Sequence, residues 1–512
     1  MKERLATLHV ICMVSDFFYP NVGGVEEHIF QLSQCLLARG HKVVVVTHVY
    51  GDRRGVRYMT NGLKVYYLPI QTFYNQSVLP TFITSIPLLR NIFLRERVTI
   101  VHGHSAFSTM AHESMNLARA MGLKSVFTDH SLFGFADMSA IVTNNLLSLS
   151  LADVNHCICV SYVGKENTVL RANVEQEKVS VIPNALDSQV FKPNPAKRPK
   201  DKINVIVMSR LMYRKGVDLQ PAIIRYICQH YPYVNFIIGG DGPKRSLLEE
   251  VRDDVGAARL CLLGAVPHGQ VHSVLVKGHI FLNTSLTEAF CIAICEAVCS
   301  GLQVVSTNVG GIPEVLPAHL IHLAHPNVAS LTEKLELAIR LEETGGGVGP
   351  WEMHLQVRNT YLWSDVMRRT EIVYSKVHEQ ESSADLVHRI PRLWYKKCGL
   401  VAGWFMMFLV TLQFLILKLC DTLWPAEGVK VHLCELDRVA RRSARRVIVI
   451  EGYTAVNGEE IVVLHDRQRC CVAVNIEERL FLRDIQKCRD HIDHDDHKSV
   501  EHTAGLGNDV LV

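Results

Sequence analysis

Residues 9–47 read HVICMVSDFFYPNVGGVEEHIFQLSQCLLARGHKVVVVT, and the architecture can be worked out from them. A strand is predicted at His9–Val14, followed by a helix at Val25–Arg39 that ends at Gly40. Lys42–Thr47 is apolar on both faces, which is typical of a buried strand in a parallel sheet. The order strand, helix, strand therefore predicts a βαβ unit.

The same alternation continues along the chain and is interrupted once. Further strands are predicted at Lys64–Leu68, Ile100–His102, Lys124–Thr128, Cys157–Val160, Ile203–Met208, Val234–Gly239, Leu260–Leu263, Ile280–Asn283 and Gln303–Ser306. Prolines between residues 183 and 199 break the pattern and indicate a hinge. We therefore expect an α/β fold with two Rossmann-like lobes, residues 1–190 and 191–360, and a crossover helix at 361–380. Because ligands bind beyond the carboxyl ends of such strands, the two facing lobes predict a cleft.

Composition narrows the class of protein. Of the 512 residues, 48% are hydrophobic and 21% charged, which excludes a disordered chain. The formal net charge of +3 gives no reason to expect nucleic-acid binding. The 15 cysteines include no C-x-x-C pair, so a zinc ribbon or redox dithiol is not expected, and scattered thiols fit a reducing compartment.

One segment has the length of a membrane span. Residues 398–417 are 20 residues without a charge, and we expect them to form a transmembrane helix. Basic residues crowd the segment before it, at Arg389, Arg392, Lys396 and Lys397, more than the segment after it. The positive-inside rule then puts the large N-terminal part in the cytosol. No role is assigned to the tail at 426–512.

Two glycines, Gly23 and Gly24, join the first strand to the first helix. Glycines there allow the backbone to approach a ligand closely, and a helix N-terminus favours an anion. A tight turn would explain them equally well. The spacing differs from G-x-G-x-x-G, so it does not support nicotinamide binding.

Two cations follow the first strand of the second lobe. Arg210 and Lys215 can both reach one anion from a strand-end loop, although a solvated basic loop has the same sequence pattern. Paired cations suit a diphosphate leaving group, whose negative charge grows as its bond breaks.

Two carboxylates lie eight residues apart at a predicted strand-to-helix junction. Glu288 precedes the helix and Glu296 lies about two turns into it, on roughly the same side. A carboxylate accepts paired hydrogen bonds from sugar or ribose hydroxyls. The backbone N–H groups at Ala289 and Phe290 face the same predicted pocket.

Together, the Gly-Gly loop, the Arg-x4-Lys-Gly loop and the Glu-x7-Glu pair resemble the family-four retaining glycosyltransferases of the GT-B fold, over about residues 8–377. More narrowly, six stretches resemble the catalytic subunits of phosphatidylinositol N-acetylglucosaminyltransferase. They are SDFFYPNVGGVEEH, TDHSLFGFAD, SRLMYRKGVDL, GGDGPKR, LTEAFCIAICEA and STNVGGIPEVLP. Ala289 and Cys291 replace glycines of the wider family, a feature that the narrower group shares.

The resemblance implies a function. The first lobe would serve the acceptor and the second the nucleotide sugar. The chain would transfer N-acetylglucosamine from UDP-GlcNAc to phosphatidylinositol, the first step of GPI-anchor biosynthesis, with retention of configuration. It would work in a multi-subunit complex at the endoplasmic reticulum membrane, without a cofactor or metal.

The resemblance also assigns roles to the donor-side residues. Gly23 and Gly24 would approach the donor phosphates, and Arg210 and Lys215 would neutralise the diphosphate. Glu288 would hold the hydroxyls of the donor sugar, beside the backbone of Ala289 and Phe290, and Glu296 would hold the ribose.

Two further residues receive roles in the same way. His130 matches the active-site histidine of the family, beside the reacting anomeric carbon, although a structural histidine is an alternative. Asp16 would help to position the acceptor.

Two other functions remain open at this point. A lipid-directed transferase with another donor, such as GDP-mannose, would share these motifs, as would a membrane scaffold that binds a nucleotide sugar without turnover.

Overall fold

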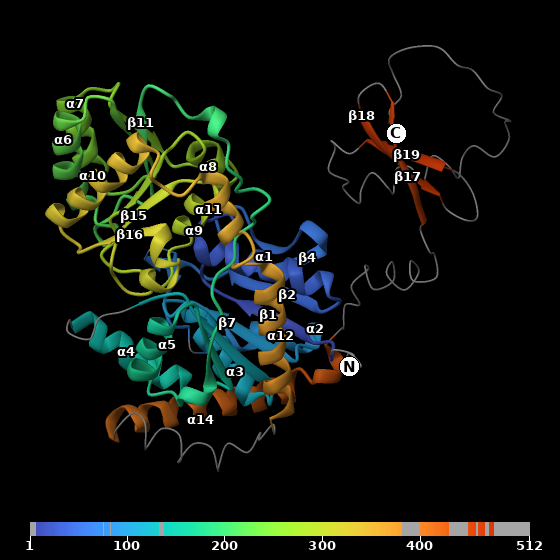
Figure 1. The fold of residues 1–512 in the computed structure, drawn as a ribbon. Coiled ribbons are helices and arrows are strands. Elements are labelled where there is room, and N and C mark those ends of the chain that lie inside the picture. Colours follow the sequence, from blue (N-terminus) through green and yellow to red (C-terminus); the bar gives the residue numbers. More distant parts are fainter. Residues whose placement is uncertain are drawn as a thin grey trace, which may run out of the picture. The chain divides into compact units, whose positions relative to one another are not determined.

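A computed structural model describes residues 7–74, 76–81, 83–132, 138–380, 400–429, 449–456, 459–465 and 471–475. The chain divides into two compact units, Met1–His432 and Leu433–Val512. The larger unit contains two α/β lobes, each a sheet with helices on both faces (Figure 1).

The N-terminal lobe is built on an eight-stranded sheet with the order β10-β9-β8-β7-β1-β2-β4-β3. Its strands are β1 (Val10–Val14), β2 (Lys42–His48), β3 (Gly55–Met59), β4 (Leu63–Leu68), β7 (Ile100–His104), β8 (Lys124–Asp129), β9 (His156–Cys159) and β10 (Val179–Val181). Neighbouring strands are parallel, except that β3 pairs antiparallel with β4. A separate pair, β5 (Thr72–Tyr74) and β6 (Ser77–Val78), is antiparallel.

Alternating side chains of this sheet supply two cores. On β2, Val43 and Val45 face one core, and Val44 and Val46 face the other. The first core is covered by α1 (Gly24–Ala38) and α12 (Trp363–Glu379). The second is covered by α2 (Ile86–Glu96), α3 (Thr109–Ala120), α4 (Met138–Leu151), α5 (Tyr162–Ala172) and α14 (Leu400–Leu423).

The C-terminal lobe has a six-stranded parallel sheet in the order β13-β12-β11-β14-β15-β16. Its strands are β11 (Ile203–Met208), β12 (Val234–Gly239), β13 (Leu260–Gly264), β14 (Ile280–Asn283), β15 (Gln303–Thr307) and β16 (Ile321–Ala324). One core lies under α8 (His268–Leu275), α9 (Ile292–Cys299) and α11 (Pro350–Val357). The other lies under α6 (Gln220–His230), α7 (Arg245–Val255) and α10 (Val328–Thr344).

The chain returns to the N-terminal lobe through α12, which packs along α1 (Figure 1). Tyr374 on α12 is buried, and its hydroxyl is hydrogen-bonded to Nδ1 of His102 on β7 at 2.7 Å. Val373 and Val377 join the same core. Because α12 follows the C-terminal lobe in the sequence and packs in the core of the N-terminal lobe, it links the two lobes.

The predicted α/β fold with two Rossmann-like lobes is confirmed. Ile203–Met208, Val234–Gly239 and Ile280–Asn283 have the predicted bounds, because each is a short apolar run buried on both faces. Sequence reasoning missed β3, β10 and β16, and also the short pair β5 and β6. The side chains of β3 are almost all exposed at a sheet edge, so it lacks the apolar signal of the buried strands.

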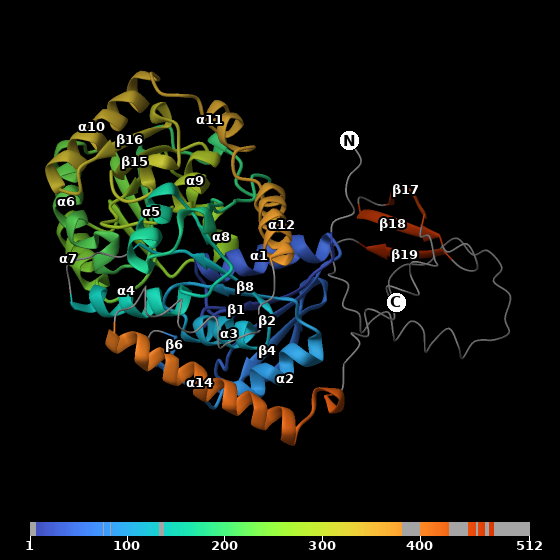
Figure 2. The same ribbon diagram turned by 90° about the horizontal axis from the view of Figure 1, so that it is seen from below.

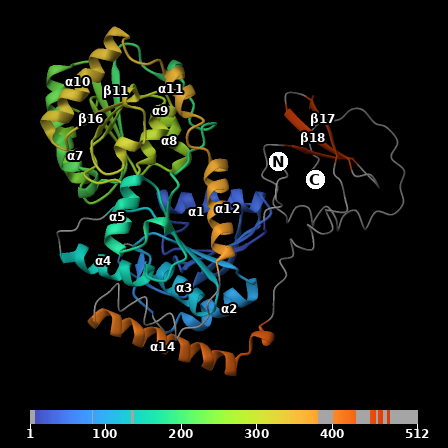
Figure 3. The ribbon, with the colours of Figure 1, turned by 60° about the horizontal axis from the view of Figure 1, so that its bottom comes forward.

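The predicted transmembrane helix at 398–417 is not confirmed. In the part of the chain that the structure describes, no helix combines the length with the apolar character that a membrane crossing requires. Residues 400–417 belong to α14, which packs against α2 and α3 (Figures 2 and 3). Residues 398 and 399 lie outside the described part.

The smaller unit contains an antiparallel sheet of β17 (Val449–Val456), β18 (Glu459–His465) and β19 (Cys471–Asn475). It falls within the tail to which the sequence assigned no role, and most of the rest of that tail lies outside the described residues.

Candidate active site

The predicted site residues come together where the carboxyl ends of the two sheets face each other. Gly23 ends the loop after β1 and Gly24 begins α1, and the loops after β11 and β14 carry Arg210 and Glu288. Because neighbouring parallel strands end at the same edge of a sheet, the loops after β11 and β14 lie together, and a hydrogen bond from Arg210 to Val22 joins them to the loop after β1. The space that these loops border is called the crevice below.

Arg210 reaches from the second lobe to the first. Its Nη2 atom donates a hydrogen bond to the backbone carbonyl of Val22 at 3.0 Å. A Cβ at position 23 would lie 2.6 Å from this nitrogen and 2.5 Å from Oε2 of Glu26, so only glycine fits there without a shift. A Cβ at Gly24 would meet no atom within 4 Å, so the backbone there borders open space.

Lys215 is held against the loop that follows β14. Its Nζ donates to Oε1 of Glu288, and Ser285 Oγ donates to the same oxygen at 2.9 Å. Burial opposes the lysine charge, but the Glu288 carboxylate outweighs it and raises the pKa of Lys215. The Lys215 and Glu288 side chains keep 28% and 13% of their surface exposed, so a ligand in the crevice can contact both.

Gly216 allows the two loops to dock. Its φ of 64° lies in the left-handed region, and a Cβ there would lie 1.8 Å from the carbonyl oxygen of Thr284. Thr284 Oγ1 also donates to the carbonyl oxygen of Lys215 at 2.8 Å. The position of the Lys215 backbone is therefore fixed by contacts with the loop after β14.

The residues that follow Glu288 lead into α9. Ala289 and Phe290 are buried, and the Phe290 ring lies edge-on to Tyr361 at a centroid distance of 5.2 Å. Glu296 on α9 is also buried and lies 3.3 Å from Nε2 of His268. This hydrogen bond raises the pKa of His268, so the pair favours a charged imidazole beside the carboxylate.

His130 follows β8 and belongs to a cluster of imidazoles. Its Nε2 lies 3.4 Å from Nδ1 of His104, and its ring is edge-to-face with His28 at a centroid distance of 4.8 Å. Burial, with the nearby His28 and His102, lowers the pKa of His130 well below its ordinary value. At neutral pH His130 is an uncharged hydrogen-bonding group.

Among the described residues, one group has the spacing that a metal ion would need. One ring nitrogen from each of His28, His104 and His130 lies within 4.8 Å of the other two. However, the two His104 nitrogens already face His130 and the sulfur of Met13. The three histidines can therefore be explained as neutral imidazoles that pack against one another, without a metal ion.

Asp16 lies in the loop after β1 and anchors the N-terminus of α3. Its Oδ1 accepts from Ser108 Oγ at 2.9 Å and from the Met110 amide at 3.0 Å, and its Oδ2 accepts from the amides of Val78 and Thr109. Burial raises the pKa of Asp16 to about 6, against the effect of these hydrogen bonds. Both oxygens are engaged within the N-terminal lobe, and the acceptor role of Asp16 stays a prediction.

A second contact between the lobes is made by the loop that follows β15. Glu314 accepts hydrogen bonds from the amides of Tyr162 and Val163, at 2.7 and 2.8 Å, and so caps α5 of the first lobe. A Cβ at Gly311 would lie 2.8 Å from Ser161 Oγ, so the backbones of the lobes meet closely here.

Sequence reasoning gave no role to Glu26, His28, His104, His268 or Glu314. Glu26 could have been noticed, because it directly follows the glycines in the first turn of a helix. The others carry no local signal, since only the folded lobes bring them to the crevice.

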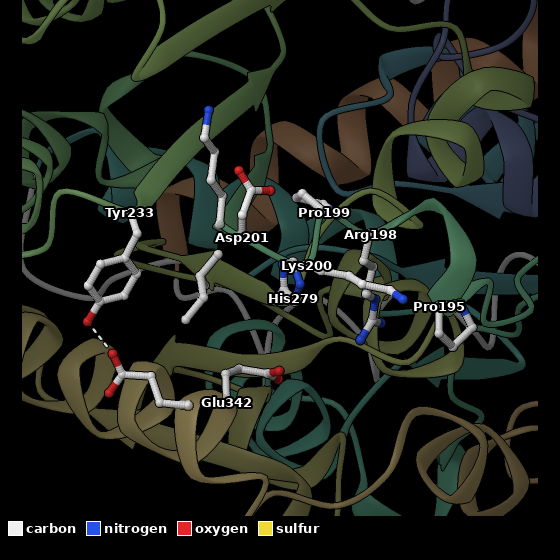
Figure 4. Close-up of a pocket in the computed structure, with 11 residues that line it drawn as sticks. Pro195, Arg198, Pro199, Lys200, Asp201, Tyr233, His279 and Glu342 are labelled. Atoms are coloured by element: carbon white, nitrogen blue, oxygen red, sulfur yellow. Dashed lines mark hydrogen bonds between the residues drawn. The ribbon is translucent and has the colours of Figure 1, made fainter.

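A separate hollow of about 640 Å³ lies in the second lobe (Figure 4). Arg198, Tyr233, His279 and Glu342 line it (Figure 4). Tyr233 and His279 directly precede β12 and β14, so the hollow borders the amino ends of the strands and lies away from the crevice.

Two family models match the chain. The model described as PIGA (GPI anchor biosynthesis) matches residues 48–137, and the model of Glycosyl transferases group 1 matches residues 189–345. Curated relatives match most of its length. The A subunit of phosphatidylinositol N-acetylglucosaminyltransferase from Homo sapiens is 58% identical over 426 residues, which is 83% of this chain and 87% of the relative. The A subunit of the same enzyme from Arabidopsis thaliana is 51% identical, over 82% of this chain and 93% of the relative.

Solved structures share the fold. Sucrose-phosphate synthase from Thermosynechococcus elongatus superimposes with a TM-score of 0.59 at 16% identity, over 72% of this chain and 98% of the other. Anabaena Alr3699/HepE in complex with UDP and glucose gives a TM-score of 0.57 at 18% identity, over 72% and 99%.

Two Rossmann-like lobes around a shared crevice define this chain as a glycosyltransferase of the GT-B fold. The sequence identities to the curated A subunits define the family of this chain more narrowly. The chain belongs to the family of phosphatidylinositol N-acetylglucosaminyltransferase A subunits, the enzymes of the first step of GPI-anchor biosynthesis.

Proposed function

We propose that this chain transfers N-acetylglucosamine from UDP-GlcNAc to the inositol headgroup of phosphatidylinositol, with retention of configuration. The observation that supports this most directly is the shared crevice of Arg210, Lys215, Glu288 and Gly23. Arg210 and Lys215 supply two cations for a diphosphate, and Glu288 supplies a hydrogen-bond acceptor for sugar hydroxyls. The backbone at Gly23 can be approached closely by the same ligand, so the site suits a nucleoside diphosphate sugar.

On the donor side, Arg210 and Lys215 neutralise the diphosphate while the backbone at Gly23 and Gly24 lies beside it. Glu288 accepts hydrogen bonds from hydroxyls of the sugar, beside the backbone of Ala289 and Phe290. These assignments are supported by position, because the Lys215 ammonium and the Glu288 carboxylate adjoin each other and remain accessible.

On α9, Glu296 holds the ribose of the donor nucleotide. The pairing with His268 orients its carboxylate before any ligand binds, which lowers the cost of ordering the side chain on binding.

In the reaction, the bond between the anomeric carbon and the diphosphate oxygen breaks, and the inositol oxygen bonds to that carbon on the same face. The proton of the inositol hydroxyl passes to the departing phosphate. Arg210 and Lys215 act mostly on the transition state, because negative charge on the leaving diphosphate grows as the bond breaks. His130, neutral beside His104, supplies a hydrogen bond near the reacting carbon without adding a charge.

We further propose that the enzyme works at the endoplasmic reticulum membrane with both lobes in the cytosol, together with other subunits. Buried free thiols such as Cys12 and Cys295 support a reducing compartment. The word subunit in the names of the relatives supports a complex.

The decisive experiment compares donors. Membranes containing the complex with this chain are supplied with radiolabelled UDP-GlcNAc or GDP-mannose, and labelled inositol lipid is measured. Label from UDP-GlcNAc, lost in a Lys215→Ala complex, is expected. If only GDP-mannose labels the lipid, the donor is GDP-mannose and not UDP-GlcNAc. If neither donor labels it, the chain binds a nucleotide sugar without turnover.

A further inference from the structure

Three histidines of the N-terminal lobe meet from three different elements, and they are called the histidine cluster below. His28 lies on α1, His104 is the last residue of β7, and His130 directly follows β8. Because β7 and β8 are parallel neighbours, His104 and His130 leave the sheet at the same edge. His28 and His104 are buried, whereas His130 is partly exposed, so a small ion has access to the cluster past His130.

The spacing within the histidine cluster fits a single metal ion. Nδ1 of His104 and Nε2 of His130 lie 3.4 Å apart. Zinc–nitrogen bonds of about 2.0–2.1 Å at a tetrahedral ion place two ligand nitrogens about 3.4 Å from each other. One ring nitrogen of each histidine, that of His28 included, lies within 4.8 Å of the other two. Closing the three nitrogens around one ion therefore requires shifts of about 1.4 Å or less.

The His28 side chain has a nitrogen without a partner. This side chain is 5% exposed, and its Nδ1 atom is buried without a hydrogen bond to any residue that the structure describes. Within the same described part of the chain, Oδ1 of the neighbouring Asn184 is also buried and makes no hydrogen bond. A polar atom that is withdrawn from water without a partner costs free energy, and a bond to a cation would remove this cost.

The contacts that hold the histidine cluster together are weak. The separation of 3.4 Å between His104 and His130 is long for a hydrogen bond, and Nε2 of His104 faces the Met13 sulfur, a weak acceptor, at 3.4 Å. An ion on Nδ1 of His104 would leave the proton on Nε2, where it points at that sulfur. His102 differs, because both of its nitrogens make hydrogen bonds of 2.7 Å. The cluster is thus stable without a metal ion and loses little when it binds one.

We propose that His28, His104 and His130 bind a divalent transition-metal ion such as Zn²⁺, and that the bound ion inhibits sugar transfer. Three imidazoles with a fourth position for water are a donor set that zinc prefers. The cluster contains no carboxylate among the described residues, and Mg²⁺ and Ca²⁺ prefer oxygen ligands, so neither of these ions is expected to bind.

Inhibition follows from the position of His130, and this part of the inference rests on the proposed function. An ion on the nitrogen of His130 would take the lone pair or the proton with which His130 makes its hydrogen bond near the reacting carbon. It would also place two positive charges beside the anomeric carbon. Positive charge develops on a sugar ring as its glycosidic bond breaks, so a nearby cation disfavours the transition state.

A direct binding measurement tests the ligands without relying on activity. The purified complex is titrated with Co²⁺, whose visible absorption reports four-coordinate binding, and Zn²⁺ is then added as a competitor. One ion per chain is expected. His28→Gln and His104→Gln should each weaken the affinity at least ~10-fold, because each removes one ligand. The melting temperature of each variant shows whether it is folded.

The control for this titration is His272→Gln, which removes a histidine of α8 in the other lobe. It should bind Co²⁺ as the unaltered complex does. Equal affinities in His272→Gln and in folded His28→Gln and His104→Gln would overturn the proposal, as would the absence of four-coordinate Co²⁺ in the unaltered complex.

A transfer assay tests the inhibition. Labelled lipid from UDP-GlcNAc is measured over a range of Zn²⁺ or Mg²⁺ concentrations, and each variant is compared with its own rate without added metal. Zn²⁺ should inhibit the unaltered complex, EDTA should restore the rate, and Mg²⁺ should have no effect. His28→Gln should require at least ~10-fold more Zn²⁺ for half inhibition. Half inhibition at the same Zn²⁺ concentration in both would overturn the inhibitory role of the cluster.

The two measurements distinguish this inference from the proposed function. If the unaltered complex transfers no sugar, the proposed function fails, while the Co²⁺ titration still decides whether the histidine cluster binds a metal ion. If the complex transfers sugar but binds Co²⁺ equally well without His28 and without His104, only the metal site is wrong.

Discussion

Lys215 and Glu288 form an ion pair on the floor of the crevice, and Ser285 donates to the same Glu288 oxygen. The pair fixes a cation and a carboxylate side by side before any donor binds. A ligand that carries both a diphosphate and hydroxyl groups can use both members. The pairing also keeps either charge from standing alone at a partly buried position.

Lys215→Ala is expected to lower kcat about 100- to 1,000-fold, because the lost cation faces charge that develops on the leaving diphosphate. The KM for the donor should change less. The measurement is initial rate against donor concentration in the assembled complex. Arg214→Ala is the matched control, since Arg214 is an exposed cation on the same short turn. An unchanged kcat in Lys215→Ala would show that Lys215 does not stabilise the transition state.

Gly23 and Gly24 should respond differently to the same substitution. Gly24→Ala adds a methyl group where no atom lies within 4 Å, so the thermal stability should be unchanged and the donor KM should rise. Gly23→Ala forces Arg210 and Glu26 apart and should lower the melting temperature as well as activity. Calorimetry and donor titration on both variants check this. A normal donor KM in Gly24→Ala would show that the open space there is not used by the donor.

The architecture could be predicted because its signal is local. Lys42–His48 is apolar at successive positions, so it had to be buried on both faces of a sheet. The loops at Arg210 and Glu288 were predictable in the same way, because each follows such a strand.

Contacts made by distant segments were not predictable. His28 and His104 meet His130 only because α1 packs beside β7 and β8. The predicted membrane crossing at 398–417 was not confirmed, and its apolar residues in α14 were counted without their partners in the fold. Leu417 packs in the apolar core of the N-terminal lobe, so part of the apolar character of α14 is used there.

Buried histidines should make the fold sensitive to acid. Burial lowers the pKa of His112, on α3, from 6.5 to about 4. The unfolded chain binds this proton between those values and the folded chain does not. Stability is therefore full above pH 6.5 and is lost as the pH falls toward 4, by about 2 kcal/mol at pH 5 for one such group. His112→Gln should reduce the difference in unfolding free energy between pH 7 and pH 5 by about that amount.

The measurement for His112→Gln is urea unfolding at both pH values. The loss of the His112 side chain lowers the unfolding free energy equally at each pH. The difference in unfolding free energy between the two pH values therefore reports only the effect of protonating His112. His28, lowered to about 4 by burial, should behave similarly, but its position beside His130 would also affect activity. An unchanged difference between the two pH values in His112→Gln would mean that His112 is protonated in the folded state.

Glu314 should control how the lobes close, because its carboxylate caps α5 of the opposite lobe through the amides of Tyr162 and Val163. An acidic cap of a helix N-terminus contributes about 1 kcal/mol. Glu314→Ala should therefore speed hydrogen exchange at those two amides about fivefold, and Glu314→Gln should have a smaller effect. Glu333→Ala, at an exposed carboxylate on α10, is the control. If both amides exchange at the same rate in Glu314→Ala and Glu333→Ala, the α5 cap does not hold the lobes together in solution.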